Sequence, residues 1–144
     1  MPSFIYFDSQ YAIRVHDYII EKSGGKKGLL NIGQIESVLE HIQNDLYYPE
    51  LEDKITHLVY SINKLNAFND GNKRSSIALG AYLLEINGID YCIDKFIIDM
   101  ENYAVYVADN LISKELLREI ICSILFEDDF SEELKMKIID ALQQ

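Results

Sequence analysis

The sequence lacks long hydrophobic runs and has few cysteines. No apolar stretch among its 144 residues reaches the length of a transmembrane helix, and its first residues show neither the basic start nor the apolar core of a secretory signal. Cys92 and Cys122 are far apart and have apolar neighbours, which excludes a paired zinc or redox motif. We therefore expect a cytoplasmic protein with free, buried thiols and no membrane contact.

Positive charge is also scarce. The chain has 13 lysine and arginine residues against 24 aspartate and glutamate residues, which gives a formal net charge of −11. This balance repels nucleic acids and anionic membrane surfaces, so we expect neither as a partner. Against this background, the adjacent cations Lys73 and Arg74 are a local exception.

Internal repeats, low-complexity tracts and alternating strand patterns longer than residues 4–7 are absent. Apolar residues instead recur at helical spacing, and 49% hydrophobic content in 144 residues suffices for one core. The sequence predicts an all-α fold, a compact single-domain bundle of about six to seven helices. We expect residues 1–126 to form its main part and residues 127–144 a peripheral C-terminal helix of the same domain.

The helix boundaries are predicted from caps, glycine and proline. Asp8 or Ser9 begins the first helix and Gly24-Gly25 ends it, while Tyr47-Tyr48-Pro49 separates the second helix from the third. The small Gly80 suggests that the fourth helix is central and closely packed. We expect helices at about residues 9–23, 32–46, 51–65, 72–86, 94–111, 114–125 and 132–142.

Residues 66–74, Asn-Ala-Phe-Asn-Asp-Gly-Asn-Lys-Arg, lie between the third and fourth predicted helices. A turn at Gly71 leads directly into a helix start, whose free N–H groups and positive dipole attract anions. Lys73 and Arg74 add formal charge, and Asp70 supplies a hard oxygen ligand. This combination is typical of a site for a magnesium-bound polyphosphate, but it contains no general base.

The same stretch resembles the signature of the Fic/Doc family, in particular its death-on-curing branch, which reads His-x-Phe-x-Asp-Gly/Ala-Asn-Lys-Arg. Eight of the nine positions are compatible. The resemblance also includes His16-Asp17, Gly24-Gly25 and residues 83–88, and it covers roughly residues 12–91. It implies a helical domain that binds ATP and Mg²⁺ and transfers part of the nucleotide to a hydroxyl group of a protein.

The resemblance also implies a role for each matching residue. Asp70 would hold the metal ion, while Asn72 and the backbone at Gly71 would surround the phosphates. Lys73 and Arg74 would contact the polyphosphate and take part in catalysis. Phe68 would anchor the loop beneath the nucleotide.

Lysine at position 73, where many family members have glycine, favours transfer of phosphate over transfer of AMP. The implied protein substrate is a translation factor such as elongation factor Tu. No inhibitory Ser/Thr-x-x-x-Glu-Gly/Asn helix is present, so control by a separate antitoxin is implied, as in a toxin-antitoxin system. Tyr47 and Tyr48 fall where we expect the segment that docks the target.

The main departure from the signature is Asn66, which stands at the position of the catalytic histidine. An amide does not accept a proton at neutral pH, so we expect weak or absent turnover. Three explanations remain open: an introduced substitution that allows a toxic protein to be produced, decay to a nucleotide-binding pseudoenzyme, or a relocated base. His57 is the nearest histidine, but nine helical residues would separate it from Asn66 by about 13 Å.

Two other functions are weighed against the transferase. One is a catalytically silent module that binds a nucleotide or a protein. The other is an HD-type phosphohydrolase, suggested by His16-Asp17, but no histidine precedes that pair as such enzymes require. We expect His16 instead to brace the loop near the motif.

Overall fold

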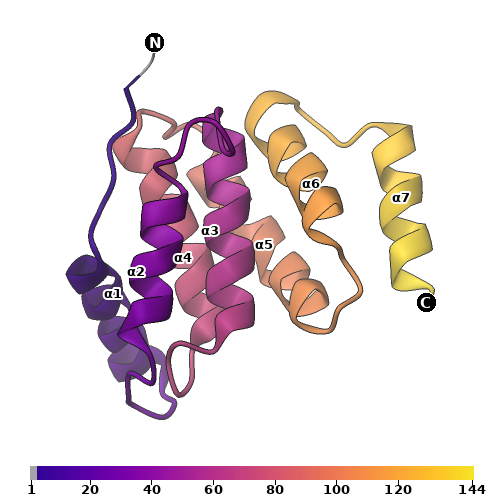
Figure 1. Ribbon diagram of the computed structural model, residues 1–144. Helices are drawn as coiled ribbons and strands as arrows, with labels where there is room; N and C mark the ends of the chain where they lie inside the picture. Colours follow the sequence, from indigo (N-terminus) through magenta and orange to yellow (C-terminus); the bar gives the residue numbers. More distant parts are fainter. Residues whose placement is uncertain (1–2) are drawn as a thin grey trace.

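The computed structural model describes residues 3–144, and in that range it is a bundle of seven helices (Figure 1). The described residues form no strand, and only an isolated antiparallel bridge pairs Leu29 with Phe68. The all-α prediction is therefore confirmed. Within these residues, no helix is long and apolar enough to cross a membrane. The helices are α1 (Ser9–Ser23), α2 (Ile32–His41), α3 (Leu51–Leu65), α4 (Asn72–Ile86), α5 (Ile93–Ala108), α6 (Lys114–Phe126) and α7 (Glu132–Leu142).

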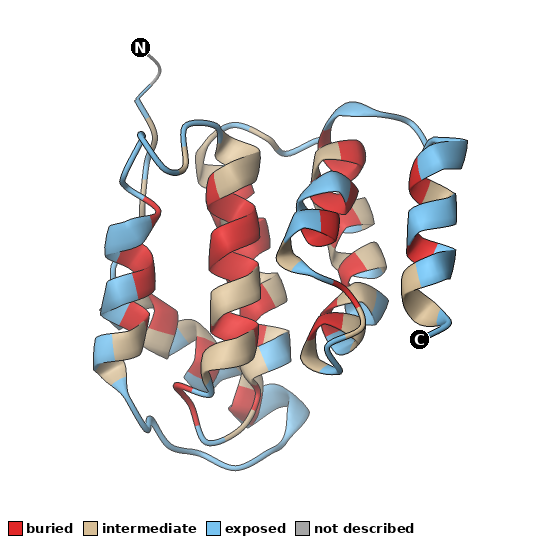
Figure 2. Cartoon of the chain, turned by 45° about the vertical axis from the view of Figure 1, so that its right-hand side comes forward, coloured by how far each residue is buried: buried red, intermediate tan, exposed pale blue. Residues whose placement is uncertain are grey.

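The two helices that flank the motif, α3 and α4, form the centre of the bundle. Helix α4 packs against α1, α3 and α5, as expected for a central helix. Its Gly80 is essential to this packing, because a Cβ there would lie 2.7 Å from Val59 Cγ2 and 3.2 Å from the ring of Phe96. Figure 2 shows that the buried residues concentrate on the inner helices, while the outer faces are exposed.

The C-terminal helix α7 lies at the edge of the bundle beside α6 (Figure 1). Ser131 caps its first turn by accepting a hydrogen bond from Leu134 N, as predicted. Leu134 and Ile138 are its buried residues, and they belong to the same hydrophobic core as the rest of the chain. Most of its remaining surface is exposed (Figure 2).

The predicted extent of the second helix was wrong. Helix α2 ends at His41, and Leu46, expected on its apolar face, is 92% exposed. The Asn44 side chain accepts hydrogen bonds from Leu46 N and Tyr47 N, which stabilises a turn rather than a further helical turn. In the same way, α5 ends at Ala108, before the predicted Leu111, because Asn110 adopts a left-handed conformation (φ 62°).

The two cysteines are free, as predicted, but only Cys92 is buried, while Cys122 is half-buried. Burial raises the pKa of both thiols. Neither is therefore activated as a thiolate nucleophile.

Candidate functional site

The motif loop is held between α3 and α4 by a second loop, residues 24–31, which follows α1. Ala67 O accepts hydrogen bonds from Leu30 N (2.7 Å) and Asn31 N (3.0 Å), and Asn69 N donates to Gly28 O (2.9 Å). The two loops therefore lie side by side and antiparallel. These main-chain hydrogen bonds fix the backbone of the motif without any contribution from side chains.

Phe68 is the buried anchor of the loop, and only 1% of it is exposed. Its ring stacks on the imidazole of His16, with ring centroids 3.7 Å apart and planes within 4°. His16 Nε2 lies 2.5 Å from Asp70 O, so it donates to that carbonyl. The prediction that His16 braces the motif loop is confirmed, and this role accounts for the His-Asp pair without a phosphohydrolase.

Asn72, the first residue of α4, closes the loop on itself. Its Oδ1 accepts from Phe68 N (3.2 Å) and its Nδ2 donates to Phe68 O (3.0 Å). Both ends of the amide are thus occupied within the motif. The geometry gives Asn72 a part in shaping the loop, and its expected contact with phosphate stays a prediction.

Asp70 presents an ionised carboxylate at the site. Its Oδ2 accepts from Lys26 N (3.0 Å) and its Oδ1 from Gly71 N (2.8 Å). These backbone hydrogen bonds, led by that of Lys26, lower the pKa of Asp70, and the charge of Arg74 adds to the effect. The carboxylate is therefore charged at neutral pH, as a metal ligand must be.

The donor set at Asp70 consists of hard oxygen atoms, the kind of ligand that Mg²⁺ prefers. Within the described residues, no group of three or more histidine, cysteine, aspartate or glutamate side chains could hold a metal ion. Asp70 is instead a single carboxylate next to amide oxygens. Mg²⁺ is commonly bound in this way, with one or two carboxylates while the substrate phosphates and water complete its coordination.

The guanidinium of Arg74 points back to the end of α1. Its Nη1 and Nη2 both donate to Gly24 O at 3.2 Å. The neighbouring Gly25 has φ 125°, and a Cβ there would lie 2.8 Å from Asp70 Oδ2 and 3.1 Å from Arg74 Nη2. Glycine at this position therefore allows the loop of residues 24–31 to approach both charged side chains. Lys73, the other cation of the motif, is exposed.

Most motif residues line a pocket of about 270 Å³, whereas Phe68 and Arg74 do not. Four elements contribute to it: the end of α3, the motif loop, the start of α4 and the end of α5. Asn66 lies in its wall with a left-handed backbone (φ 50°) at the C-cap of α3. The lining residues are Asn63, Lys64, Asn66, Asn69, Asp70, Gly71, Asn72, Lys73 and Ala108.

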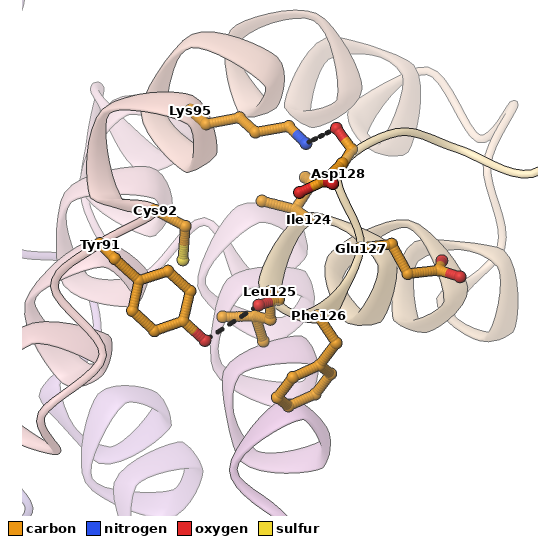
Figure 3. A pocket seen from close by; sticks show the side chains of 8 residues that line it. All are labelled: Tyr91, Cys92, Lys95, Ile124, Leu125, Phe126, Glu127 and Asp128. Atoms are coloured by element: carbon orange, nitrogen blue, oxygen red, sulfur yellow. Dashed lines mark hydrogen bonds between the residues drawn. The ribbon is translucent and has the colours of Figure 1, made fainter.

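Larger cavities lie away from the motif. One, of about 400 Å³, is formed by the start of α5 and the end of α6, and Figure 3 shows Tyr91 donating to Leu125 O (3.0 Å) and Lys95 to Asp128 O (3.0 Å) across it. A second, of about 460 Å³, lies between α2 and α3, and a third, of about 310 Å³, lies beside Tyr47 and Tyr48. None of these is lined by a residue of the motif, so chemistry rather than size identifies the candidate site.

The structure does not bring Tyr47 and Tyr48 to the motif. They precede the first turn of α3, whereas the motif follows its last turn, about 21 Å along the helix axis. The segment that lies against the motif is residues 24–31 instead. The role of Tyr47 and Tyr48 in docking the target stays a prediction, and the sequence held no signal for how the loop after α1 folds back against the motif.

His57 does not replace the missing base. Its Nδ1 accepts from Tyr48 Oη (3.0 Å) and Lys114 Nζ (2.8 Å), and its side chain does not line the motif pocket. Burial, followed by the charge of Lys114, lowers the pKa of His57 to about 4. The interpretation that a relocated base lies at this residue is therefore wrong.

Sequence reasoning missed four residues of the pocket, namely Asn63, Lys64, Asn69 and Ala108. Lys64 Nζ donates to Asn110 Oδ1 and so joins the end of α3 to the turn after α5. A signal was present, because asparagine recurs at every third position from residue 63 to residue 72. In the folded chain, all four of these asparagines line the pocket.

The part of the chain that contains this site is similar to known proteins. The model of the Fic/DOC family matches residues 6–84, more than half of the chain. The protein named "Protein kinase doc" of Escherichia phage P1 is 31% identical over 81 residues, which covers 54% of this chain and 64% of that protein, less than two thirds of its length. The match includes α1, the motif loop and most of α4. The chain belongs to the Fic/DOC family.

Proposed function

We propose that this protein is a Doc-like toxin that binds ATP with Mg²⁺ and transfers the terminal phosphate to a hydroxyl group of a cytoplasmic protein. The observation that carries the proposal is the pocket at the start of α4, which is lined by the ionised Asp70 carboxylate and by Lys73. The relative that is named a protein kinase supports phosphate as the transferred group. A translation factor such as elongation factor Tu is the proposed substrate, and an antitoxin in trans is the proposed partner.

Each motif residue has a defined task in this proposal. Asp70 binds the metal ion, and Lys73 together with the N-terminus of α4 neutralises phosphate charge. Arg74 exchanges its bond to Gly24 O for a bidentate contact with the polyphosphate. Bound Mg²⁺ supplies charge neutralisation between the phosphate groups.

Asn66 limits this activity, because it offers no base to accept the proton of the target hydroxyl. General-base catalysis is commonly worth about 10²- to 10⁴-fold in rate, so we expect the native chain to bind ATP but turn over slowly. Histidine is among the residues that tolerate a left-handed backbone, so the conformation at position 66 accepts the change to histidine. Asn66→His is therefore expected to raise the rate by about 10²- to 10⁴-fold.

The test incubates the native protein and Asn66→His with Mg²⁺ and ATP labelled at either the α or the γ phosphate. Elongation factor Tu and a bacterial extract serve as targets, and mass spectrometry of labelled products distinguishes addition of phosphate from addition of AMP. The double variant Asn66→His/Arg74→Ala is the control. If Asn66→His labels no protein under these conditions, the transferase proposal is wrong.

A second function, a catalytically silent nucleotide-binding module, is favoured by one observation, the amide at the position of the base. Calorimetry of Mg-ATP binding to the native chain and to Arg74→Ala separates the alternatives. Binding that weakens in Arg74→Ala, combined with no labelling by Asn66→His, would support the silent module. Absence of binding in both proteins would leave only a protein-interaction role.

A further inference from the structure

Asn63 carries a buried acceptor that the protein does not satisfy. The residue lies in the last turn of α3 and is only 5% exposed. Its Nδ2 donates to Ala104 O of α5 at 2.9 Å. Its Oδ1 has no hydrogen-bond partner among residues 3–144. Folded proteins rarely leave such an oxygen unpaired, because water has been removed from it without replacement.

The orientation of this amide is determined by its neighbour. Ala104 O is an acceptor, so the Asn63 atom that faces it must be the nitrogen, and the oxygen is directed elsewhere. Asn63 lines the motif pocket together with Ala108, which lies one turn after Ala104 on α5. Asn63 therefore brings a buried acceptor, whose orientation is fixed by α5, to the pocket wall formed by α3 and α5.

The chemistry of the acceptor selects the part of the ligand it can contact. The phosphates of a nucleotide are anionic acceptors, which a carbonyl oxygen repels and which Lys73 and the start of α4 attract. The nucleoside carries the donors, namely the ribose hydroxyls and the exocyclic amino group of the base. A donor from this part of the ligand would pair the orphaned oxygen and recover the lost hydrogen bond.

Resting on the proposed function, we propose that Asn63 is a specificity-determining residue whose Oδ1 accepts a hydrogen bond from the nucleoside part of the bound nucleotide. A site built around a hydrogen bond rejects analogues that lack the donor, because the acceptor is then left unpaired. The same reasoning predicts that the preference disappears when the acceptor is removed.

The test measures by calorimetry the binding of ATP, 2′-deoxy-ATP, 3′-deoxy-ATP and inosine triphosphate, each with Mg²⁺, to the native protein and to Asn63→Leu. Leucine has a similar volume and no acceptor. We expect one analogue to bind the native protein about 5- to 100-fold more weakly than ATP, and the analogue that does so identifies the donor. In Asn63→Leu, this ratio should fall to about 1.

Ser123→Ala is the matched control, because its hydroxyl is also buried without a partner within the described range, yet it lies on α6 and does not line the pocket. This variant should keep the native ratios.

If all analogues bind the native protein as tightly as ATP does, the role of Asn63 is excluded, and this holds even where Asn63→Leu does not fold. Equal weakening of every nucleotide in Asn63→Leu would also exclude it, since a purely structural residue acts in that way. Absence of any nucleotide binding would overturn the proposed function itself.

Discussion

His16 and Phe68 join α1 to the motif loop through two parallel rings whose centroids are 3.7 Å apart. The same imidazole donates from Nε2 to Asp70 O, two residues further along the chain. One side chain thus fixes both the anchor of the loop and the backbone of the residue that presents the carboxylate. The shape of the site therefore depends on a helix that contributes no side chain to the pocket lining.

This arrangement predicts the effect of His16→Phe. The variant keeps an aromatic ring against Phe68 but leaves Asp70 O without its donor, which is expected to cost about 1–3 kcal/mol of unfolding free energy. Chemical denaturation measures the loss, and hydrogen exchange should show faster opening of the amides at residues 69–72. Asp17→Asn is the control, because Asp17 is exposed and contacts the His16 ring only at Nδ1. Equal stability of His16→Phe and the native protein would contradict the role given to the Nε2 bond.

The glycine pair after α1 offers a matched comparison. Gly24 and Gly25 both have positive φ, at 82° and 125°, so alanine strains the backbone at either position. A Cβ at Gly24 would meet no atom within 4 Å, whereas one at Gly25 would lie 2.8 Å from Asp70 Oδ2. Both variants should lose about 1 kcal/mol of stability or more, and Gly25→Ala should lose the most.

The two glycine variants should differ more in binding than in stability. We expect Gly25→Ala alone to weaken Mg-ATP binding, by about tenfold or more, because it displaces the carboxylate of Asp70 from the Lys26 amide. Calorimetry measures both variants under the same conditions. Equal affinities would show that the close approach of Gly25 does not position Asp70.

The central features of the fold follow from local sequence patterns, and the errors arise where tertiary contacts decide. Helix α3 and the start of α4 were predictable because apolar spacing and Gly71 act within a few residues. The packing of residues 24–31 against the motif was not predictable, because it depends on main-chain hydrogen bonds between segments about 40 residues apart. Asn63 was missed for the same reason, since its partner lies on α5.

Lys54 connects the start of α3 to the turn after α2. The side chain is fully buried, and its Nζ donates to Ile42 O and to Asp45 Oδ1, both at 2.7 Å. Lys54→Met keeps most of the volume but leaves the buried Ile42 carbonyl unpaired, so we expect a loss of about 1–3 kcal/mol in unfolding free energy. Asp45→Asn should cost less, because its carboxylate is half-exposed and solvated. A larger loss of unfolding free energy in Asp45→Asn than in Lys54→Met would mean that Lys54 stabilises the fold mainly through the ion pair rather than through its contact with the Ile42 carbonyl.

His57 should make the stability of the protein depend on pH. The folded chain holds its pKa at about 4, against an ordinary value of 6.5, because the ring is 9% exposed and faces Lys114 and His41. Below pH 6.5 the His57 ring is protonated in the unfolded chain but stays neutral in the folded chain. Protonation therefore favours the unfolded state increasingly as the pH falls. The free energy of unfolding should therefore be unaffected by His57 above about pH 7 and decrease by up to about 3 kcal/mol between pH 6.5 and pH 4.

Carboxylates also titrate near the lower end of this range, so the measurement compares urea denaturation of the native protein with that of His57→Gln at pH 7.5, 6.5, 5.5 and 4.5. The difference in unfolding free energy between the two proteins should change by roughly 1 kcal/mol per pH unit below pH 6, with His57→Gln losing less as the pH falls. His41→Gln is the control, since His41 is exposed and its charge is a minor cause of the shift. Parallel pH profiles for the native protein and His57→Gln would show that His57 protonates equally in the folded and unfolded chains, and that its contacts with Tyr48 and Lys114 do not hold it neutral.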